Sequence, residues 1–499
     1  MLNNKAVVIF ASVSITLAII TVAFGYTGYS LHGSLDSTFF IPPAISLAIG
    51  QGFRNPISDL RSEWGDPTGQ ERYLYFPPLF SLVISSFILK TSSIPPSQQA
   101  FLGTGILSAI AILLTSLVFY KVATLHGKKF DFLSAFLISS ILFIILRTLW
   151  SIMSRPETLE SIFLATGFLI ALGARRPWKL IISFATILGL MAATHPFGTL
   201  FFASFVGLFF SFIYKWRRSL AYTGTVYALG VVAFFVIMQA SPYGIFETFT
   251  GVLNHSSHEL QRISIDLAVV FIKSPHAILY GMMMIFSAFF CAHFYLRHRD
   301  RIKALFPFLI FATIICFLMA YFILIEIKTY YALLFSILIF SFFIYYITHV
   351  LNIRPLKYSL LLFVAFFAVL SLKTLLIFPF YIKDGTSIAN GRVEFEKIIA
   401  RYPRTDMFLA GSLWVLSENY DQFHSISDLP MDRKTRPPLL IVLDQNQSYM
   451  ELDPTPEPLT EVEGCPLIEN RFVGKIPELF GVKLANAMPG YGFAVYECK

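Results

Sequence analysis

Four short stretches of the sequence place charged or polar side chains where proton transfer or anion binding is possible. They are LHGSLDSTFF with Asp36, SRPETLES with Arg155 and Glu157, ATHPFG with His195, and IEIKTYY with Lys328 and Tyr330. A carboxylate that is partly removed from water has a raised pKa and can act as a general base, which is the role expected for Asp36. Cationic side chains stabilise a phosphate. The predicted chemistry is therefore proton abstraction beside an anionic group.

Each stretch also has a structural interpretation, and the sequence leaves both open. Asp36 is suited to cap a helix, because capping residues surround it and Pro42 follows. A side chain such as Arg155 can reach toward lipid headgroups, and an acid such as Glu157 is favourable in the first turn of a helix. A neutral histidine beside a proline is often structural, and Lys328 would anchor a helix next to an aromatic belt.

Motifs for nucleotides and catalytic zinc are absent from the sequence, which contains no GxxxxGK[ST], no GxGxxG after a predicted strand and no HExxH. The stretch NHSSHELQR contains the pattern H-x-x-H-E (His255, His258 and Glu259), which looks like a metal site on a helix, yet the order is not HExxH and a third ligand is not evident. We therefore predict no metal site and no cofactor, and leave a requirement for a divalent metal open.

The composition is that of a membrane protein, since 56% of the 499 residues are hydrophobic and only 14% are charged, against about 25% charged in a soluble protein. We expect a mainly α-helical protein with about eleven spans, the first a retained signal anchor. The expected spans are 6–25, 100–120, 131–149, 157–173, 180–194, 197–214, 220–239, 276–296, 303–325, 329–350 and 358–378.

Lysine and arginine gather in alternate loops, which the positive-inside rule assigns to the cytoplasm. These loops are KVATLHGKK (121–129), ARRPWK (174–179), YKWRR (214–218), RHRDRIK (297–303) and NIRPLK (352–357). The apolar segment Pro77–Leu89 has only 13 residues, too few to span, and the rule holds only if it does not cross. Residues 26–99 then form one large outer loop of a membrane domain, 1–379.

The chain changes character after residue 379. Residues 380–499 hold 17 acidic and 12 basic side chains, with a helical pattern in EFEKIIARYP and short strand patterns in DMFLAG, PLLIVLD and GFAVYE. We predict a small extracytoplasmic α/β domain over 380–499. Cys465 and Cys498 would then lie in an oxidising compartment, where a disulfide can form. The positive charge of the membrane part reflects topology and not nucleic-acid binding.

The candidate site residues all map to the outer side of the membrane. A transporter is expected to place essential charges near the midplane, so the pattern favours chemistry on a membrane-borne substrate. A flippase or transporter and a non-catalytic assembly protein are the alternatives.

The order of motifs resembles the GT-C superfamily of polytopic glycosyltransferases, and is most similar to the protein O-mannosyltransferase and aminoarabinose transferase branch. The resemblance rests on LDSTFF, AISLAIG, YLYFPPLF and SRPETLES, within about the first 200 residues, with KTYY (328–331) in weaker support. Many members of that branch have an Asp-Glu pair where this chain has Asp36 and Ser37.

The resemblance implies transfer of a sugar from a polyprenyl-phosphate donor to a lipid, glycan or protein acceptor, with inversion, in a multi-pass protein of a bacterial inner membrane. By position, Asp36 would be the catalytic base. Arg155, His195 and Lys328 would contact the donor phosphate, and Glu157 and Tyr330 would complete the substrate-binding set.

Overall fold

Long apolar helices dominate the computed structural model, which describes residues 2–27, 37–53, 77–151, 153–173, 176–239, 332–351, 353–383, 388–403, 405–409, 423–425, 439–444, 461–462, 464–473, 478–479, 482–483 and 491–498. Within these ranges, six helices are long and apolar enough to cross a membrane. They are α1 (Leu2–Tyr26), α4 (Pro96–Ala123), α5 (Phe132–Ser151), α6 (Pro156–Gly173), α9 (Trp216–Met238) and α15 (Arg354–Lys383).

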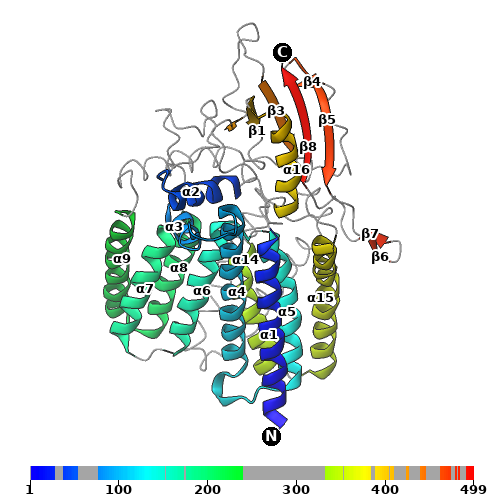
Figure 1. The fold of residues 1–499 in the computed structure, drawn as a ribbon. Coiled ribbons are helices and arrows are strands. Elements are labelled where there is room, and N and C mark those ends of the chain that lie inside the picture. The colour runs from blue at the N-terminus through cyan, green and yellow to red at the C-terminus, as the bar shows by residue number, and fades with distance from the viewer. Residues whose placement is uncertain are drawn as a thin grey trace.

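Shorter apolar helices complete the bundle in Figure 1. They are α7 (Pro177–Ala192), α8 (Pro196–Ile213) and α14 (Ala332–Tyr345), which continues as the π-helical turn η4 (Tyr346–Val350). The expected spans 276–296 and 303–325 lie outside the described residues, so the count of eleven stays a prediction. The described helices are compatible with a multi-pass membrane protein.

Small residues allow the first helices to pack closely. A Cβ added to Gly25 would lie 2.5 Å from the Cα of Gly105, so α1 and α4 touch through their backbones, as small residues permit in membrane bundles. The indole of Trp150 on α5 stacks on Phe24 of α1 with ring centroids 4.0 Å apart. The same indole donates a hydrogen bond to the Thr21 hydroxyl at 3.0 Å, which ties α5 to α1.

The outer surface of the bundle is apolar. Leu200 on α8 and Leu362 on α15 are 70% and 72% exposed, a surface suited to contact with lipid. At the end of the bundle where α1 begins, Trp216 lies within 5.3 Å of the Arg217 guanidinium and Trp178 within 5.5 Å of the Lys179 ammonium. Tryptophan beside a cation is typical of the membrane–water interface.

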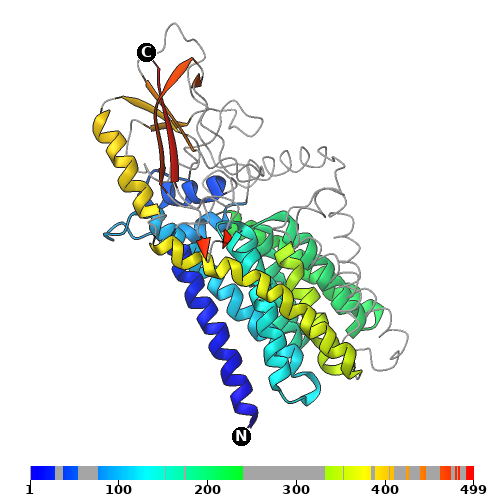
Figure 2. The same cartoon turned by 90° about the vertical axis from the view of Figure 1, so that its right-hand side faces the viewer.

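Two short helices lie across the other end of the bundle, near the strands (Figures 1 and 2). These are α2 (Ser37–Ile49) and α3 (Leu79–Ser85). The Ser81 hydroxyl of α3 donates to the Phe40 carbonyl of α2 at 2.8 Å. With seven residues, α3 is about 10 Å long, so it does not span a membrane by itself.

The C-terminal part forms a mixed sheet of six strands in the order β2-β1-β3-β8-β5-β4. Strand β1 pairs in parallel with β2 and β3, whereas β3-β8, β8-β5 and β5-β4 are antiparallel. The strands are β1 (Asp406–Leu409), β2 (Phe423–Ser425), β3 (Leu439–Asp444), β4 (Glu461–Val462), β5 (Cys465–Val473) and β8 (Tyr491–Cys498), and β6 (Glu478–Leu479) with β7 (Val482–Lys483) makes a separate hairpin.

Alternate residues of the central strands face opposite sides of this sheet, as the pleat requires. Leu440 and Val495 join one continuous apolar cluster with α16 (Ile388–Arg401), α2, α3 and the start of α4. The Arg392 guanidinium of α16 also donates to the Ser97 hydroxyl of α4 at 2.8 Å. The sheet and α16 are therefore joined to the end of the bundle that carries α2 and α3.

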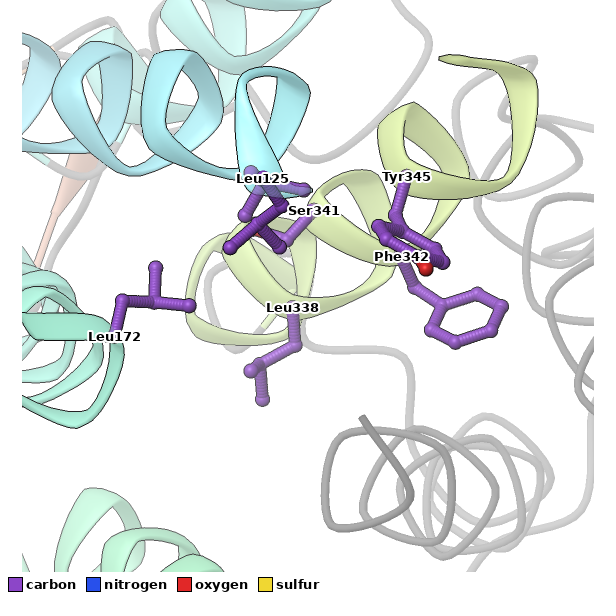
Figure 3. A pocket seen from close by; sticks show the side chains of 7 residues that line it. Leu125, Leu172, Leu338, Ser341, Phe342 and Tyr345 are labelled. Carbon is purple, nitrogen blue, oxygen red and sulfur yellow. The ribbon is translucent and has the colours of Figure 1, made fainter. Parts of the chain in front are cut away.

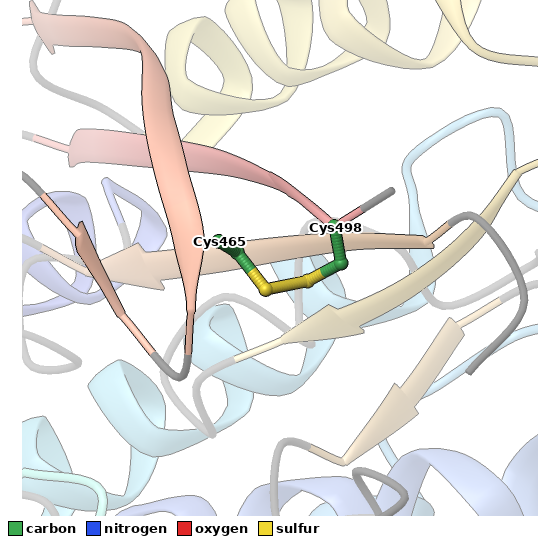
Figure 4. The surroundings of a disulfide bond; sticks show 2 residues. All are labelled: Cys465 and Cys498. Carbon is green, nitrogen blue, oxygen red and sulfur yellow. A yellow bond between two sulfur atoms is a disulfide. The ribbon is translucent and has the colours of Figure 1, made fainter. Parts of the chain in front are cut away.

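A disulfide joins Cys465, where β5 begins, to Cys498, where β8 ends (Figure 4). The two strands are neighbours in the sheet, and the bond closes their shared end. The sequence raised this pairing only as a possibility, and the structure shows it.

Candidate functional site

Arg155 and Glu157 form a buried ion pair where α5 passes into α6. The Arg155 Nε donates to Glu157 Oε2 at 3.1 Å, and Nη2 donates to Oε1 at 3.0 Å. The side chains are only 6% and 0% exposed. This two-pronged geometry is the strong form of an arginine–carboxylate contact. The interpretation of Arg155 as a side chain that reaches toward headgroups is therefore wrong, since the guanidinium is turned inward and its charge is compensated.

His195 joins this pair from another part of the chain, the turn between α7 and α8. Its backbone N–H donates to the Met191 carbonyl at 2.9 Å, which closes the last turn of α7. The side chain is 9% exposed and lies near enough to Glu157 for the two to interact electrostatically. The structure thus brings three of the six predicted site residues together.

Glu160 is a fourth ionisable residue of the cluster, and the sequence analysis missed it. It follows Glu157 by three residues on α6, so both point from the same side of the helix, and it is fully buried. Within the described part of the chain, neither carboxylate oxygen has a hydrogen-bond partner. Buried charged groups in a span usually pair or serve a function, so the E-x-x-E spacing at the start of a span was the signal available.

The carboxylate of Glu160 lies against the backbone of Gly198, in the first turn of α8. A Cβ on Gly198 would overlap Oε1. The Gly198 amide approaches the carboxylate, although the geometry falls short of a hydrogen bond. The first amides of a helix lack intrahelical partners and carry the positive end of the helix dipole. The start of α8 therefore provides a partial positive charge beside Glu160.

A second buried polar atom lies nearby in the chain. The Ser154 hydroxyl directly precedes Arg155 and also has no hydrogen-bond partner among the described residues. Unpaired buried polar atoms are few in native proteins and call for an explanation. Ser154 just before α6 and Glu160 in its second turn carry polar atoms whose missing contacts water or another molecule can supply.

The elements around the cluster hold it next to α2 and α3. The Leu79 amide, at the start of α3, donates to the Ala193 carbonyl of the α7–α8 turn at 3.0 Å. Leu159, between the two acids on α6, belongs to the same apolar cluster as Phe40 of α2 and Phe80 of α3. The ionisable residues therefore lie at the end of the bundle that faces the sheet.

The depth of the cluster follows from helix geometry. At 1.5 Å per residue, Glu160 lies about 6 Å from the start of α6, whose 18 residues span about 27 Å. The middle of the helix lies about 13 Å from its start. The acids are thus near one end of the span and away from its middle.

The other predicted site residues, Asp36, Lys328 and Tyr330, lie outside the described residues. Helix α2 begins at Ser37, immediately after Asp36. The metal-like stretch at 255–259 is also outside them. In the part of the chain that the structure describes, no three His, Cys, Asp or Glu side chains are placed to bind a metal ion.

Comparison with known proteins gives no assignment. No protein-family model, curated protein or solved structure matches this chain.

Proposed function

We propose that this chain is an integral membrane glycosyltransferase that moves a sugar from a polyprenyl-phosphate donor to a lipid, glycan or protein acceptor. The observation that carries the proposal is the buried cluster of Arg155, Glu157, Glu160 and His195 at the end of the bundle that also holds α2. Groups able to exchange protons and to bind anions at one end of the spans suit a substrate that is itself held in the membrane.

The proposed membrane orientation puts the sheet outside. Two features support it. The Cys465–Cys498 disulfide fits an oxidising compartment. The turns between α4 and α5 and between α8 and α9 lie at the opposite end of the bundle (Figure 1). They contain Lys128, Lys129 and Lys215, as the positive-inside rule expects of a cytoplasmic face. In this proposal eleven spans carry an extracytoplasmic α/β domain, and the location is a bacterial inner membrane.

The proposed reaction is a single displacement. The Asp36 carboxylate takes the proton of an acceptor hydroxyl, and the hydroxyl oxygen forms a bond to the anomeric carbon. The bond between that carbon and the phosphate oxygen breaks, and its electron pair leaves with the polyprenyl phosphate. One carboxylate is sufficient, and the anomeric centre inverts.

The Arg155–Glu157 ion pair changes which cation we expect to contact the donor phosphate most strongly. Because Glu157 compensates the charge of Arg155, the two act as one nearly neutral unit, and we assign the stronger cationic contact with the donor phosphate to Lys328. His195 would assist there, since cationic donors stabilise the charge that develops on a leaving phosphate. Glu157 and Tyr330 stay in the substrate-binding set, with Glu157 acting through Arg155.

The depth of the cluster is unlike that expected of a flippase or transporter, the alternative function. Transporters typically bind their cargo near the midplane, whereas Glu157 and Glu160 lie in the first turns of α6. An assembly protein without catalysis would use the C-terminal sheet as its binding surface and would not depend on Asp36.

The test first identifies the donor, by mass spectrometry of the lipid-linked sugars that accumulate in a deletion strain. Transfer of the sugar from this donor is then assayed in membranes that contain the full-length Asp36→Asn variant. Loss of a general base should slow transfer by about 100-fold or more while membrane insertion and thermal stability are unchanged. Asp59→Asn, an acid in the same segment, is the matched control and should retain activity. Near-normal transfer by Asp36→Asn would exclude the proposed mechanism.

A further inference from the structure

Five cations gather where α7 and α9 begin, at the end of the bundle opposite the buried cluster around Glu157. All five are exposed, and together they are called the basic rim: Arg176, Lys179, Lys215, Arg217 and Arg218. The sequence contains no acidic residue between Glu160 and Glu247. Among the described residues, none of the five takes part in an ion pair. The basic rim is therefore a strongly positive patch.

Close packing holds the two helix starts side by side (Figure 1). A Cβ added to Gly189 of α7 would lie 2.6 Å from the Cβ of Ala233 on α9. Nearer the basic rim, the Phe210 ring of α8 lies 5.9 Å from the Phe184 ring of α7 and 5.8 Å from the Tyr222 ring of α9. Phe184 and Tyr222 are each about 10 Å along their helix. Both helices therefore begin at the same level, next to the end of α8.

Aromatic and then aliphatic side chains continue the surface away from the basic rim. Trp178 and Trp216 are 55% and 71% exposed, and each ring lies over a cation of the basic rim. Four residues further on, and so on the same face of each helix, Ile182 and Leu220 are 53% and 69% exposed. Cations, tryptophan and aliphatic side chains thus follow one another within about two turns, in the order that matches the headgroups, interface and hydrocarbon of a bilayer.

A lipid at this end of the protein has room on the surface of the bundle and not inside it. The pocket that the structure describes here is lined by apolar side chains, among them Leu125, Leu172 and Leu338 (Figure 3). Its volume of about 20 Å³ holds about one water molecule, far less than an acyl chain. The exposed faces of α7 and α9 have no such limit.

The combination of charge and apolar surface decides the kind of partner. A nucleic acid or an acidic protein would meet the cations but would gain nothing from Ile182 and Leu220. A zwitterionic lipid would contact the apolar side chains, but its own ammonium group offsets its attraction to the basic rim. An anionic lipid satisfies both parts, and each lysine or arginine near a membrane surface strengthens such binding by about fivefold.

We propose that the basic rim binds the headgroup of one anionic glycerophospholipid between the first turns of α7 and α9, with the acyl chains along Ile182 and Leu220. The site is separate from the buried cluster around Glu157. It depends neither on the proposed transfer reaction nor on the proposed orientation.

The test is native mass spectrometry of the full-length protein in detergent, titrated with phosphatidylglycerol or phosphatidylcholine of the same chains. The wild type should retain one phosphatidylglycerol in preference to phosphatidylcholine. Arg217→Gln with Arg218→Gln should weaken the binding of phosphatidylglycerol by about 30-fold, since two charges are lost. Arg217→Lys with Arg218→Lys keeps both charges and should keep most of the binding. Detergent removes any effect of the variants on membrane orientation.

The matched control is Lys128→Gln with Lys129→Gln, in the turn between α4 and α5 at the same end of the bundle. This variant also removes two exposed charges, but residues 124–131 contain no tryptophan. The preference for phosphatidylglycerol should be unchanged. Equal loss in this control would show that the total charge of this end, and not the basic rim, governs binding.

Three further results would overturn the proposal. They are a wild-type preference in the Arg217→Gln, Arg218→Gln variant, an equal loss in the variant that keeps both charges as lysine, and displacement of phosphatidylglycerol by inorganic phosphate. If the glutamine variant of the two arginines does not fold, Lys179→Gln with Lys215→Gln removes two other charges of the basic rim. That variant should show a similar loss of about 30-fold, and wild-type binding by it would equally contradict the site.

Discussion

The Glu160 carboxylate rests on the backbone of Gly198, so that a hydrogen atom is the largest group that position 198 can carry without moving the acid. The contact joins α6 to the first turn of α8 across 38 residues of chain. It fixes the position of a buried acid that has no hydrogen-bond partner among the described residues.

Gly198→Ala should destabilise the protein by about 1–3 kcal/mol, the usual cost of forcing extra volume into a packed interior. Because the overlap is with Glu160 alone among the nearest atoms, adding Glu160→Ala should recover part of the loss. Thermal unfolding of the single and double variants in detergent measures this coupling. Purely additive effects would contradict a direct contact between the two positions.

Removing one member of the Arg155–Glu157 pair should be costly. Arg155→Ala is expected to lower the free energy of unfolding by about 3–5 kcal/mol, since it leaves Glu157 buried without its partner. The double variant Arg155→Met, Glu157→Leu should have a free energy of unfolding closer to that of the wild type. The measurement is the free energy of unfolding in denaturant.

A control for the ion pair is available on the same helix. Glu160→Gln removes a carboxylate that has no hydrogen-bond partner among the described residues, so stability should be unchanged or higher. If Glu160→Gln were as destabilising as Arg155→Ala, the pairing of Arg155 with Glu157 would not explain the loss.

The disulfide predicts a specific response to reduction. Its cysteines are 33 residues apart, and a loop of that length stabilises a fold by about 3–4 kcal/mol in the chain-entropy model. Reduction should lower the unfolding temperature of the native protein. In a variant with Cys291→Ser and Cys316→Ser, a maleimide should label no cysteine before reduction and two afterwards. Labelling before reduction would show that the bond is not formed in the cell.

The orientation of the bundle can be measured at the two ends of α4. In the Cys291→Ser, Cys316→Ser background, Lys90→Cys should react with an impermeant maleimide in intact cells. Lys129→Cys should react only after the membrane is opened. Lys5→Cys, in the first turn of α1, should behave like Lys129→Cys, because α1 begins and α4 ends at the same end of the bundle (Figure 1). Equal reactivity at positions 90 and 129 would contradict the proposed topology.

Local pattern predicted much of the secondary structure. The span expected at 157–173 is α6, and the strand expected in PLLIVLD is β3, because apolar runs and alternation are properties of neighbouring residues. Strand β5 was missed. Its sequence, CPLIENRFV, mixes polar residues into the strand, and its register shifts between Leu467 and Glu469, which breaks the alternation that identifies a strand.

The candidate site was predicted only in part. Arg155, Glu157 and His195 stood out as polar residues at the ends of apolar segments, and the structure brings them together. Glu160 lies in the same stretch, SRPETLES, and was missed, because its significance depends on its contact with Gly198 and on its carboxylate having no hydrogen-bond partner among the described residues.

The sequence by itself determined that the chain is rich in apolar helices with basic loops and has an acidic C-terminal part with helix and strand patterns. Composition and periodicity show this because they reflect the burial of each helix or strand separately. Only the tertiary structure decided that Arg155 is compensated by Glu157 inside the protein and that Glu160 rests on Gly198. These relations depend on how separate helices cross, and the energy of a charge depends on the neighbours that such crossings place around it.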